Sequence, residues 1–402
     1  MNLSKFVRLT EVALINPGVT KRPDVEELVS FVPMAGVSAE TATVSCESRI
    51  FGEVRKGYTL FENGDLLLAK ITPCFENGKI AQASVDHQVG AGSTEFHVIR
   101  PDPDRLDDRY LLHFLRRPVI RQLGIRRMTG SGGQRRVPEA FIAGLELPLP
   151  EVSKQREVAA VLDLVGELRS KRVSALDGLN SLAASIFSDV FGDPRSNPNG
   201  WRIDRLGSIV MEFRYGTSNK SGAEGRPALR IPNVVGGSLD LTDLKLVSVL
   251  PKEFDRLKLV NGDLLFVRTN GNPNYVGRCA VFEEGLVRPA GFRADEYIYA
   301  SYLIRARLRR ETAHPIFIQE YMRSSAGRMA LRERCKTSAG QYNLNVESLG
   351  SIPVPIPPME LQEEFANRIA RLDRLKVAYR THLGELNNLF ASLQDKAFRG
   401  EL

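Results

Sequence analysis

The residues whose types and spacing come closest to a known chemistry lie at Asn272-Pro273-Asn274-Tyr275. This segment is one residue away from an Asn-Pro-Pro-Tyr box, in which a rigid backbone and a stacking aromatic ring hold the amino group of a flipped adenine. Asn274 replaces the second proline, and no glycine-rich cofactor loop following a strand precedes the segment. We therefore interpret the stretch that begins at Arg268 as a polar loop and not as a catalytic box.

The other catalytic and metal-binding patterns are also incomplete. Asn77-Gly78-Lys79 lacks the first glycine of a P-loop, which stands four intervening residues before the second, and Ile80 replaces the serine or threonine after the lysine. No His-Glu-x-x-His helix and no Cys-x-x-Cys pair is present, and the cysteines stand far apart at Cys46, Cys74, Cys279 and Cys335. We therefore expect no catalysis by this chain and no metal or cofactor bound to it.

The remaining candidate side chains are suited to binding nucleic acid. Arg and Lys present paired donors to guanine, and Asn and Gln present a donor and an acceptor to adenine. In the first half of the chain the candidates are Lys70, Thr72, Lys79, Gln134, Arg135 and Arg136. In the second half they are Arg230, Asn233, Arg268, Asn270, Asn272, Lys336, Ser338, Gln341, Tyr342 and Asn343, with the tyrosine able to pack on a sugar or a base.

The charge distribution supports an anionic partner. The net charge is +7, and the segment from Arg109 to Pro138 carries eight arginines without any Asp or Glu. The segment from Arg305 to Lys336 carries nine basic residues against three glutamates. Two basic patches fit a DNA duplex bound across both halves of the chain, and the alternative is a solvated helix face.

These basic segments belong to an internal repeat. Ser131 and Ser338 lie 207 positions apart, and three elements recur at this distance: Ser131–Gln134 with Ser338–Gln341, Leu147–Pro150 with Val354–Pro357, and Gln155 with Gln362. Leu9 and Leu206, near the start of each half, lie 197 positions apart, so the length variation falls inside the halves while their flanks keep register. We expect a two-headed molecule with approximate internal twofold symmetry, which suits a bipartite target such as duplex DNA.

The repeat also limits which residues can specify a base. Gln134 and Gln341 occur in both halves, although the halves are expected to bind different sequences. They are better suited to fixing the frame or holding phosphate, and the same applies to the matching pair Lys79 and Arg278. We expect the residues that specify bases to lie where the halves differ.

The elements that must position these side chains differ within each half. Short strands joined by Gly and Asn turns are expected at Asp65–Ala69, Lys79–Ala81 and Glu95–Ile99, followed by a helix over 107–128. A long amphipathic helix is expected from about Ser153, a plausible N-cap, to Phe191, with local weakening at Gly166 and Gly178. Some 37 residues would span roughly 55 Å.

A second long helix repeats this apolar stripe near the C-terminus. We expect the two helices to pack against each other through Val158, Leu162, Val165, Leu179, Ile186, Phe365, Ile369, Leu372, Leu386 and Leu393. The alternative is that each helix only covers the core of its own domain. Such an antiparallel pair would act as a spacer between the two β-rich blocks.

The arrangement resembles the specificity subunit of a Type I restriction-modification enzyme over essentially the whole chain. The similarity rests on the repeated Gly-Gln and Leu-Pro-Leu-Pro-like elements, on Asp65–Cys74 with Gly92–Phe96, and on the C-terminal segment Phe398–Leu402. It implies an α+β fold: two pseudo-symmetric, β-rich mixed α/β target-recognition domains separated by two long antiparallel coiled-coil-like helices. The implied boundaries are 1–150 and 195–357 for the recognition domains, and 151–194 and 358–402 for the helices and the linker.

The resemblance also implies a function and partners. Each recognition domain would bind one half of a bipartite, asymmetric double-stranded DNA site. The helices would set the spacing and dock two methyltransferase subunits, which carry S-adenosylmethionine, and motor-nuclease subunits could join the complex. The alternative is a two-headed DNA-binding or scaffold protein of another phage-defence system that acts without a methyltransferase.

The expected location is the cytoplasm. No apolar run reaches the ~20 residues needed to cross a membrane. The segment Met1–Lys5 lacks the apolar core of a signal peptide. The scattered cysteines agree with a reducing compartment.

Overall fold

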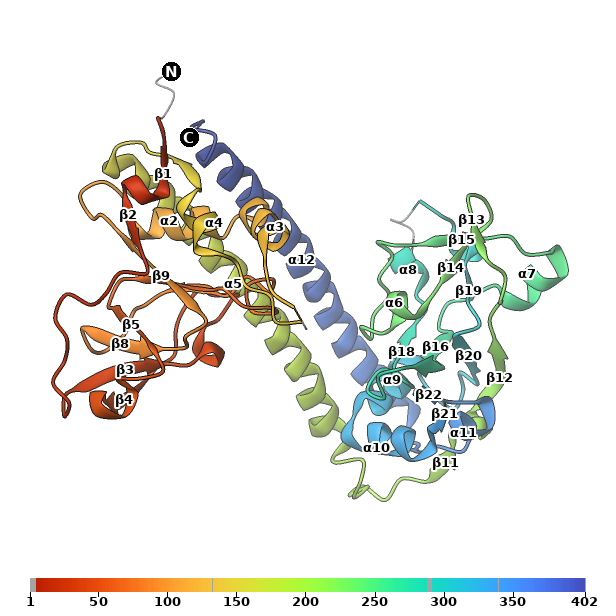
Figure 1. Cartoon of the computed structure of the whole chain (residues 1–402). Coiled ribbons are helices and arrows are strands. Elements are labelled where there is room, and N and C mark those ends of the chain that lie inside the picture. Colours follow the sequence, from red (N-terminus) through yellow and green to blue (C-terminus); the bar gives the residue numbers. More distant parts are fainter. Residues whose placement is uncertain (1–4, 132, 288–290, 339, 402) are drawn as a thin grey trace. The chain divides into compact units, whose positions relative to one another are not determined.

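The computed structural model describes residues 5–131, 133–287, 291–338 and 340–401. The chain forms two compact units (Figure 1). Unit 1 combines residues 1–175 with 379–402, and unit 2 comprises residues 176–378. Each unit therefore contains one β-rich block and part of each of the two long helices, α5 (Val152–Phe191) and α12 (Met359–Ala397).

Unit 1 contains two four-stranded sheets. The first has the order β2-β9-β6-β7 and is antiparallel throughout; its strands are Ala13–Ile15, Phe96–Pro101, Leu66–Ala69 and Ile80–Gln82. The second has the order β4-β3-β8-β5, with strands Glu47–Ile50, Leu28–Val32, Val89–Gly92 and Thr59–Glu62. The expected strands at 65–69, 79–81 and 95–99 are confirmed as β6, β7 and β9.

Three short helices of unit 1 follow β9, the last strand of the first sheet: α2 (Asp108–Leu115), α3 (Pro118–Arg127) and α4 (Glu139–Ala143). The helix α1 (Phe51–Val54) and the 3₁₀ turns Leu9–Glu11 and Met34–Gly36 lie earlier in the chain. The expectation of one helix over 107–128 is wrong. Pro118 has no backbone N–H and its ring is incompatible with a helix interior, so it begins a new helix instead.

Unit 2 repeats the first sheet of unit 1. Its order is β12-β20-β16-β18, with strands Val210–Tyr215, Leu303–Leu308, Leu264–Val267 and Cys279–Val281. The second sheet, β13-β15-β14-β19, has strands Ser221–Gly222, Lys245–Val247, Arg226–Leu229 and Ile298–Tyr299. In both units a central strand of this sheet pairs in parallel with a later strand, β3 with β8 and β14 with β19, whereas the outer strands differ.

A third sheet in unit 2 has the order β17-β22-β21, with strands Thr269–Asn270, Gln341–Asn343 and Lys336–Ser338. The helices of this unit are α6 (Ile231–Val234), α7 (Pro251–Leu257), α8 (Glu284–Val287), α9 (Pro315–Arg323), α10 (Ser325–Arg334) and α11 (Val346–Gly350), with 3₁₀ turns at Leu206–Ile209 and Ala294–Glu296. The pairs α2–α3 and α9–α10 begin at positions 207 apart, as the repeat predicts.

The two sequence offsets reappear in backbone pairing. β1 (Phe6–Arg8) pairs antiparallel with β10 (Glu146–Pro148), and β11 (Ile203–Arg205) pairs in the same way with β23 (Pro353–Pro355). The paired residues of β11 lie 197 positions after those of β1, and the paired residues of β23 lie 207 positions after those of β10. Because the strand at the start of each block closes on the strand at its end, the length variation is confined to the interior of the block.

A buried ion pair is also repeated. Arg100 donates to both carboxylate oxygens of Asp65 at 2.7 Å, and Arg307 donates to both oxygens of Asp263 at 2.8 Å. The two carboxylates are 2% and 0% exposed. A bidentate partner and the backbone N–H groups of Glu62 and Val260 compensate for removing these charges from water. Each ion pair ties the first sheet to the turn that precedes one of its inner strands, β6 in unit 1 and β16 in unit 2.

The long helices pack together within each unit. In unit 1, Arg169 of α5 donates to Asn387 of α12 at 2.7 Å, and Arg172 lies over the ring of Tyr379 at 4.4 Å. The residue number rises on α5 while it falls on α12, so the helices run antiparallel. In unit 2, the ring of Phe365 on α12 lies 5.5 Å from Phe187 and 5.1 Å from Phe191 on α5.

The apolar stripe serves two purposes in the structure. Val158 and Leu162 are buried with Phe398 in the core of unit 1, and Phe365, Ile369 and Leu372 are buried in the core of unit 2. Val165 is also buried, whereas Leu179, Ile186, Leu386 and Leu393 are half-buried. The helices therefore contact each other and also cover the β-rich blocks.

Two details of the long helices differ from the expectation. The helix α5 begins at Val152, so Ser153 lies inside the first turn and is not the N-cap. Gly166 and Gly178 lie within one continuous helix of 40 residues. Packing of the apolar face, which dominates helix stability in proteins, accounts for this continuity.

Candidate nucleic-acid interface

Six of the candidates in the second half meet on the three-stranded sheet of unit 2. β21 and β22 form a hairpin, in which Lys336 pairs with Asn343 and Ser338 with Gln341. β17 joins the other edge of β22 and pairs Asn270 with Tyr342. The backbone of Ser338 belongs to this sheet, but its side chain and the next residue, Ala339, lie outside the described residues.

The turn of this hairpin requires glycine. Gly340 has φ +75°, in the left-handed region that residues with a Cβ rarely adopt. No atom lies within 4 Å of where a Cβ would be, so the conformation and not a lack of space favours glycine.

Polar side chains surround the hairpin. The hydroxyl of Thr269 donates to Oε1 of Gln341 at 3.1 Å, and the guanidinium of Arg268 lies over the ring of Tyr215 at 4.6 Å. Lys336, Gln341 and Asn272 are exposed. The surface thus combines cationic donors with amide groups, the mixture that contacts both phosphates and base edges.

The first half builds the same feature with different residues. Thr129 and Ile71 each form a β-bridge with Arg136. Thr129, Ile71 and Arg136 correspond, in that order, to Lys336, Thr269 and Asn343 of unit 2. Gly133 has φ +77°, close to the value of Gly340. The preceding residue, Gly132, lies outside the described residues. Both units therefore carry a hairpin with glycine and glutamine at its turn.

Hydrogen bonds and ion pairs hold the hairpin of unit 1 against the loop at Thr72. The hydroxyl of Thr72 donates to the Gly133 carbonyl at 2.5 Å and accepts from the Arg135 N–H at 3.1 Å. Arg135 pairs with Glu76 at 3.0 Å, and Arg136 pairs with Glu95 at 2.7 Å. The hydrogen bond from Arg136 holds the pKa of Glu95 below its usual value, although partial burial opposes this shift. Gln134 is exposed.

Lys70 and Lys79 have structural contacts near this hairpin. The backbone N–H of Lys70 donates to Glu95, and its carbonyl accepts from Val137. The ammonium of Lys79 donates to the Met34 carbonyl at 2.8 Å, and its repeat partner Arg278 donates to the Val235 carbonyl at 3.1 Å. Each basic side chain therefore holds a backbone carbonyl in the segment that follows an inner strand, β3 or β14, consistent with a role common to both units.

Arg230 and Asn233 lie apart from the hairpin, at α6. Asn233 is 2% exposed; its Oδ1 accepts from the Arg230 N–H at 2.8 Å, and its Nδ2 donates to the Asp240 carbonyl at 2.7 Å. Arg230 pairs with Asp243 at 2.7 Å, and this bond together with one from Lys245 lowers the pKa of Asp243. The structure places these two candidates in the internal network of a loop.

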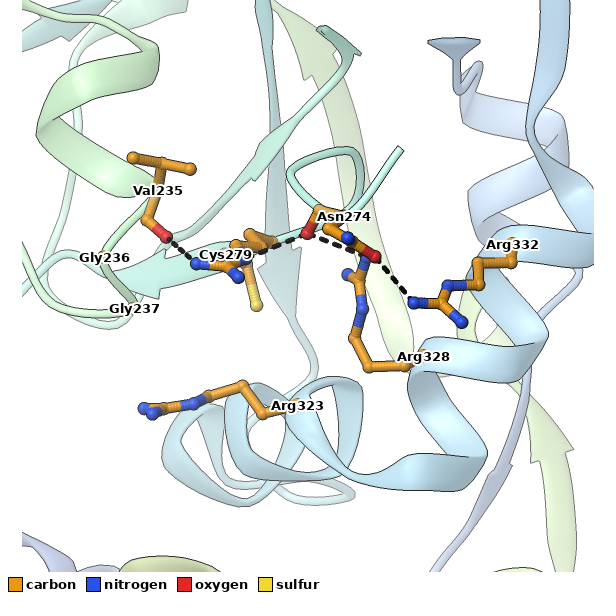
Figure 2. A pocket seen from close by; sticks show the side chains of 9 residues that line it. Val235, Gly236, Gly237, Asn274, Cys279, Arg323, Arg328 and Arg332 are labelled. Carbon is orange, nitrogen blue, oxygen red and sulfur yellow. Dashed lines mark hydrogen bonds between the residues drawn. The ribbon is translucent and has the colours of Figure 1, made fainter. Parts of the chain in front are cut away.

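A cluster of arginines in unit 2 forms a further candidate site that the sequence patterns did not predict. Arg278, Arg323, Arg328 and Arg332 line a cavity of about 360 Å³ together with Asn274 (Figure 2). Arg328 and Arg332 are one helical turn apart on α10, the spacing that puts both on one face. That spacing is a sequence signal for a basic helix face. The approach of the loop at Asn274 to this face is a long-range contact, which the spacing does not predict.

Across residues 5–131, 133–287, 291–338 and 340–401, no three His, Cys, Asp or Glu side chains converge in a way that could hold a metal ion. The segment Asn272–Tyr275 lies in a loop, where the Asn274 carbonyl and side chain accept from arginines. Within the described part of the chain, no helix combines the length and apolarity needed to span a membrane.

Comparisons with known proteins show which family this chain is similar to. Residues 1–173 match the family described as Type I restriction modification DNA specificity domain. The chain is 36% identical over 190 residues to the Type I restriction enzyme EcoEI specificity subunit of Escherichia coli, a match that covers 46% of this chain and 32% of that protein. It therefore spans about a third of the length of that relative.

Two further matches extend over more of the chain. The Type I restriction enzyme EcoKI specificity subunit of Escherichia coli strain K12 is 28% identical over 324 residues, covering 76% of this chain and 68% of that protein. The solved structure of the Type I restriction-modification system S subunit from M. genitalium matches with a TM-score of 0.58 at 14% identity, over 99% of this chain and 97% of that one. At this identity the structural match supports the fold alone.

Proposed function

We propose that this chain, whose residues 1–173 match the Type I restriction modification DNA specificity domain, is the sequence-specific DNA-binding subunit of a Type I restriction-modification complex. Each unit binds one half of a bipartite, asymmetric DNA site. The observation that carries the proposal is the hairpin that both units build at equivalent positions, with the same glycine conformation and different neighbouring side chains.

The pattern of shared and differing residues assigns roles within the hairpins. Gln134 and Gln341 occupy the same position, so they suit contacts that both half-sites offer, such as phosphates. The strand positions differ: Thr129 corresponds to Lys336, and Arg136 to Asn343. Side chains with different donor and acceptor patterns discriminate different base edges, so these positions are where the half-sites are distinguished.

The long helices are the proposed docking surface for two methyltransferase subunits. Both helices keep large apolar side chains exposed, among them Leu164 on α5 and Leu375 on α12. Exposed apolar residues that are rimmed by charge mark protein interaction surfaces. In this proposal S-adenosylmethionine is bound by the methyltransferase, motor-nuclease subunits complete the restriction complex, and the assembly acts in the cytoplasm.

Methylation mapping tests the function directly. DNA from cells that express the neighbouring methyltransferase, with and without this gene, would be sequenced by a long-read method that detects N6-methyladenine. We expect one bipartite motif to lose methylation in the deletion and to regain it on complementation. An active methyltransferase with no motif that depends on this gene would contradict the proposal and favour a two-headed DNA-binding protein that acts without a methyltransferase.

A further inference from the structure

The arginine pocket lies entirely within unit 2, outside the hairpin sheet. Arg323 comes from the end of α9, Arg328 and Arg332 come from α10, and the loop carrying Asn274 faces them (Figure 2). Residues Val235–Gly237 form the opposite wall. Four guanidinium groups from three separate segments therefore border one cavity of about 360 Å³.

The hydrogen bonds inside this pocket end mostly on neutral oxygens. Arg332 donates to Oδ1 of Asn274 at 2.6 Å, and Arg328 donates to the carbonyls of Val276 and Asn274 at 3.0 and 3.1 Å. Arg278 donates to the carbonyls of Asn274 and Val235. Of the four arginines, Arg323 alone donates to a carboxylate, that of Glu320 at 3.1 Å, within the part of the chain that the structure describes.

The charges in the pocket also act on one another. Burial lowers the pKa of Arg328, and the neighbouring positive charges of Arg278 and Arg332 lower it further. Like charges held at close range are unfavourable unless an anion joins them, because Coulomb repulsion is stronger at a partly desolvated site than in water. The pocket is thus arranged so that a bound anion would relieve its repulsion.

Three of the four positions are also basic in unit 1. Arg116 corresponds to Arg323, Arg121 to Arg328 and Lys79 to Arg278, while Ile125 replaces Arg332. Arg116 donates to the carbonyls of Ala39 and Glu40, so it also lies against the loop after an inner strand. A basic set repeated in two units whose hairpins differ suits a feature that every DNA half-site shares.

We propose that the pocket lined by Arg278, Arg323, Arg328 and Arg332 binds a phosphodiester group of the DNA backbone. The inference rests on the proposed function and deepens it by naming a contact that is independent of base sequence. Guanidinium groups suit this ligand because each offers two parallel N–H donors to a pair of phosphate oxygens. Arg332 is the addition specific to unit 2, so it is the residue to test.

The test compares the full chain with Arg332→Gln and a matched control, Arg202→Gln. Arg332 is exposed and donates to the side chain of Asn274, so its loss should not disturb the fold. Arg202 is also exposed, pairs with Asp204 and lies in the same unit, so the control removes the same charge. Affinity for a 40-base-pair duplex would be measured by fluorescence anisotropy over a series of salt concentrations.

We expect Arg332→Gln to weaken duplex binding several-fold and to reduce the slope of log K against log salt by about one unit, with Arg202→Gln close to wild type. A slope for Arg332→Gln equal to that of the control would overturn the pocket assignment while leaving the proposed function intact. A wild-type chain that binds no duplex would overturn both. Thermal unfolding of each variant would verify that the fold is intact.

A second arm separates the DNA backbone from a free anion. Inorganic phosphate would be titrated into wild type and Arg332→Gln without DNA, and the melting temperature recorded. Under the proposal, wild type shows little stabilisation by millimolar phosphate, because a single free ion lacks the rest of the DNA contacts. Strong stabilisation that Arg332→Gln abolishes, together with an unchanged salt slope, would identify a free-anion site and overturn the assignment to DNA.

Discussion

Gln155 and Gln362 occupy the same buried position in the two units and make the same set of hydrogen bonds. Each Oε1 accepts from the N–H of the residue that caps a helix, Asp107 at 2.8 Å or His314 at 2.9 Å. Each Nε2 donates to the carbonyl five residues earlier, at 2.8 Å in both units, and to a second carbonyl beyond the last strand of the first sheet. One side chain thus ties the start of a long helix to the start of a short one.

We predict that Gln362→Ala destabilises unit 2 by about 1–3 kcal/mol, because it leaves buried N–H and carbonyl groups without partners. Trp201 is the only tryptophan and packs on Phe191 within unit 2, so its fluorescence reports the unfolding of that unit in urea. Gln155→Ala should instead destabilise unit 1 and change the circular-dichroism transition more than the fluorescence transition. An unchanged midpoint in both variants would refute the anchoring role, and the exposed Gln122→Ala serves as control.

The second prediction concerns base specificity in unit 2. Asn343→Ala should relax recognition at one base pair of one half-site, since loss of a paired amide contact costs about 1–3 kcal/mol on the cognate site. Arg136→Ala, at the equivalent position of unit 1, should relax the other half-site. Long-read methylation mapping of cells carrying each variant would measure this. If both variants relax the same half-site, or neither relaxes any, the assignment of one unit to each half-site is wrong.

The third prediction concerns the stability of unit 1 in acid. Asp163 accepts from His113 at 2.8 Å and from Arg109 at 3.0 Å. Burial acts to raise the pKa of Asp163, but these hydrogen bonds outweigh it and lower the pKa from 3.8 to about 2. The unfolded state therefore binds the proton more readily, so the stabilisation is present above about pH 4 and is lost as the pH falls toward 2.

Urea unfolding followed by circular dichroism at pH 7, 4 and 3 would measure this effect. Asp163→Asn should lose stability at pH 7 and show a smaller further loss between pH 4 and pH 3 than wild type. Parallel pH profiles of the two proteins would contradict the role of Asp163. The exposed Asp177→Asn provides a control on the same helix.

The fourth prediction contrasts two kinds of glycine. Gly178 of α5 and Gly384 of α12 lie in helices with open space around the position of a Cβ, so alanine there should stabilise by about 0.5–1 kcal/mol. Gly340 also has open space but has φ +75°, so alanine there should cost about 1 kcal/mol and weaken DNA binding. Thermal unfolding would measure all three variants. A stabilising Gly340→Ala would show that the hairpin turn tolerates another conformation.

The sequence alone predicts the repeat, three strands of unit 1 and the two long helices of this protein. The shared Gly-Gln and Pro-containing elements locate equivalent positions in the two halves. In the structure the strands β1 and β10 of unit 1 pair in the same way as β11 and β23 of unit 2, at the offsets found in the sequence. The strands at 66–69, 80–82 and 96–101 and the two long helices are recognisable because apolar periodicity is a local property. The break at Pro118 was missed because the apolar pattern continues across it.

Only the tertiary structure decides which polar residues share a surface. Asn233 has the side chain of a base-reading residue, yet folding buries it among backbone carbonyls. Asn270 and Tyr342 become partners across 72 residues of chain, and the arginine pocket joins three separate segments. The repeat and the helical stripes are encoded by neighbouring residues, whereas these surfaces depend on long-range strand pairing and loop packing, which no local pattern specifies.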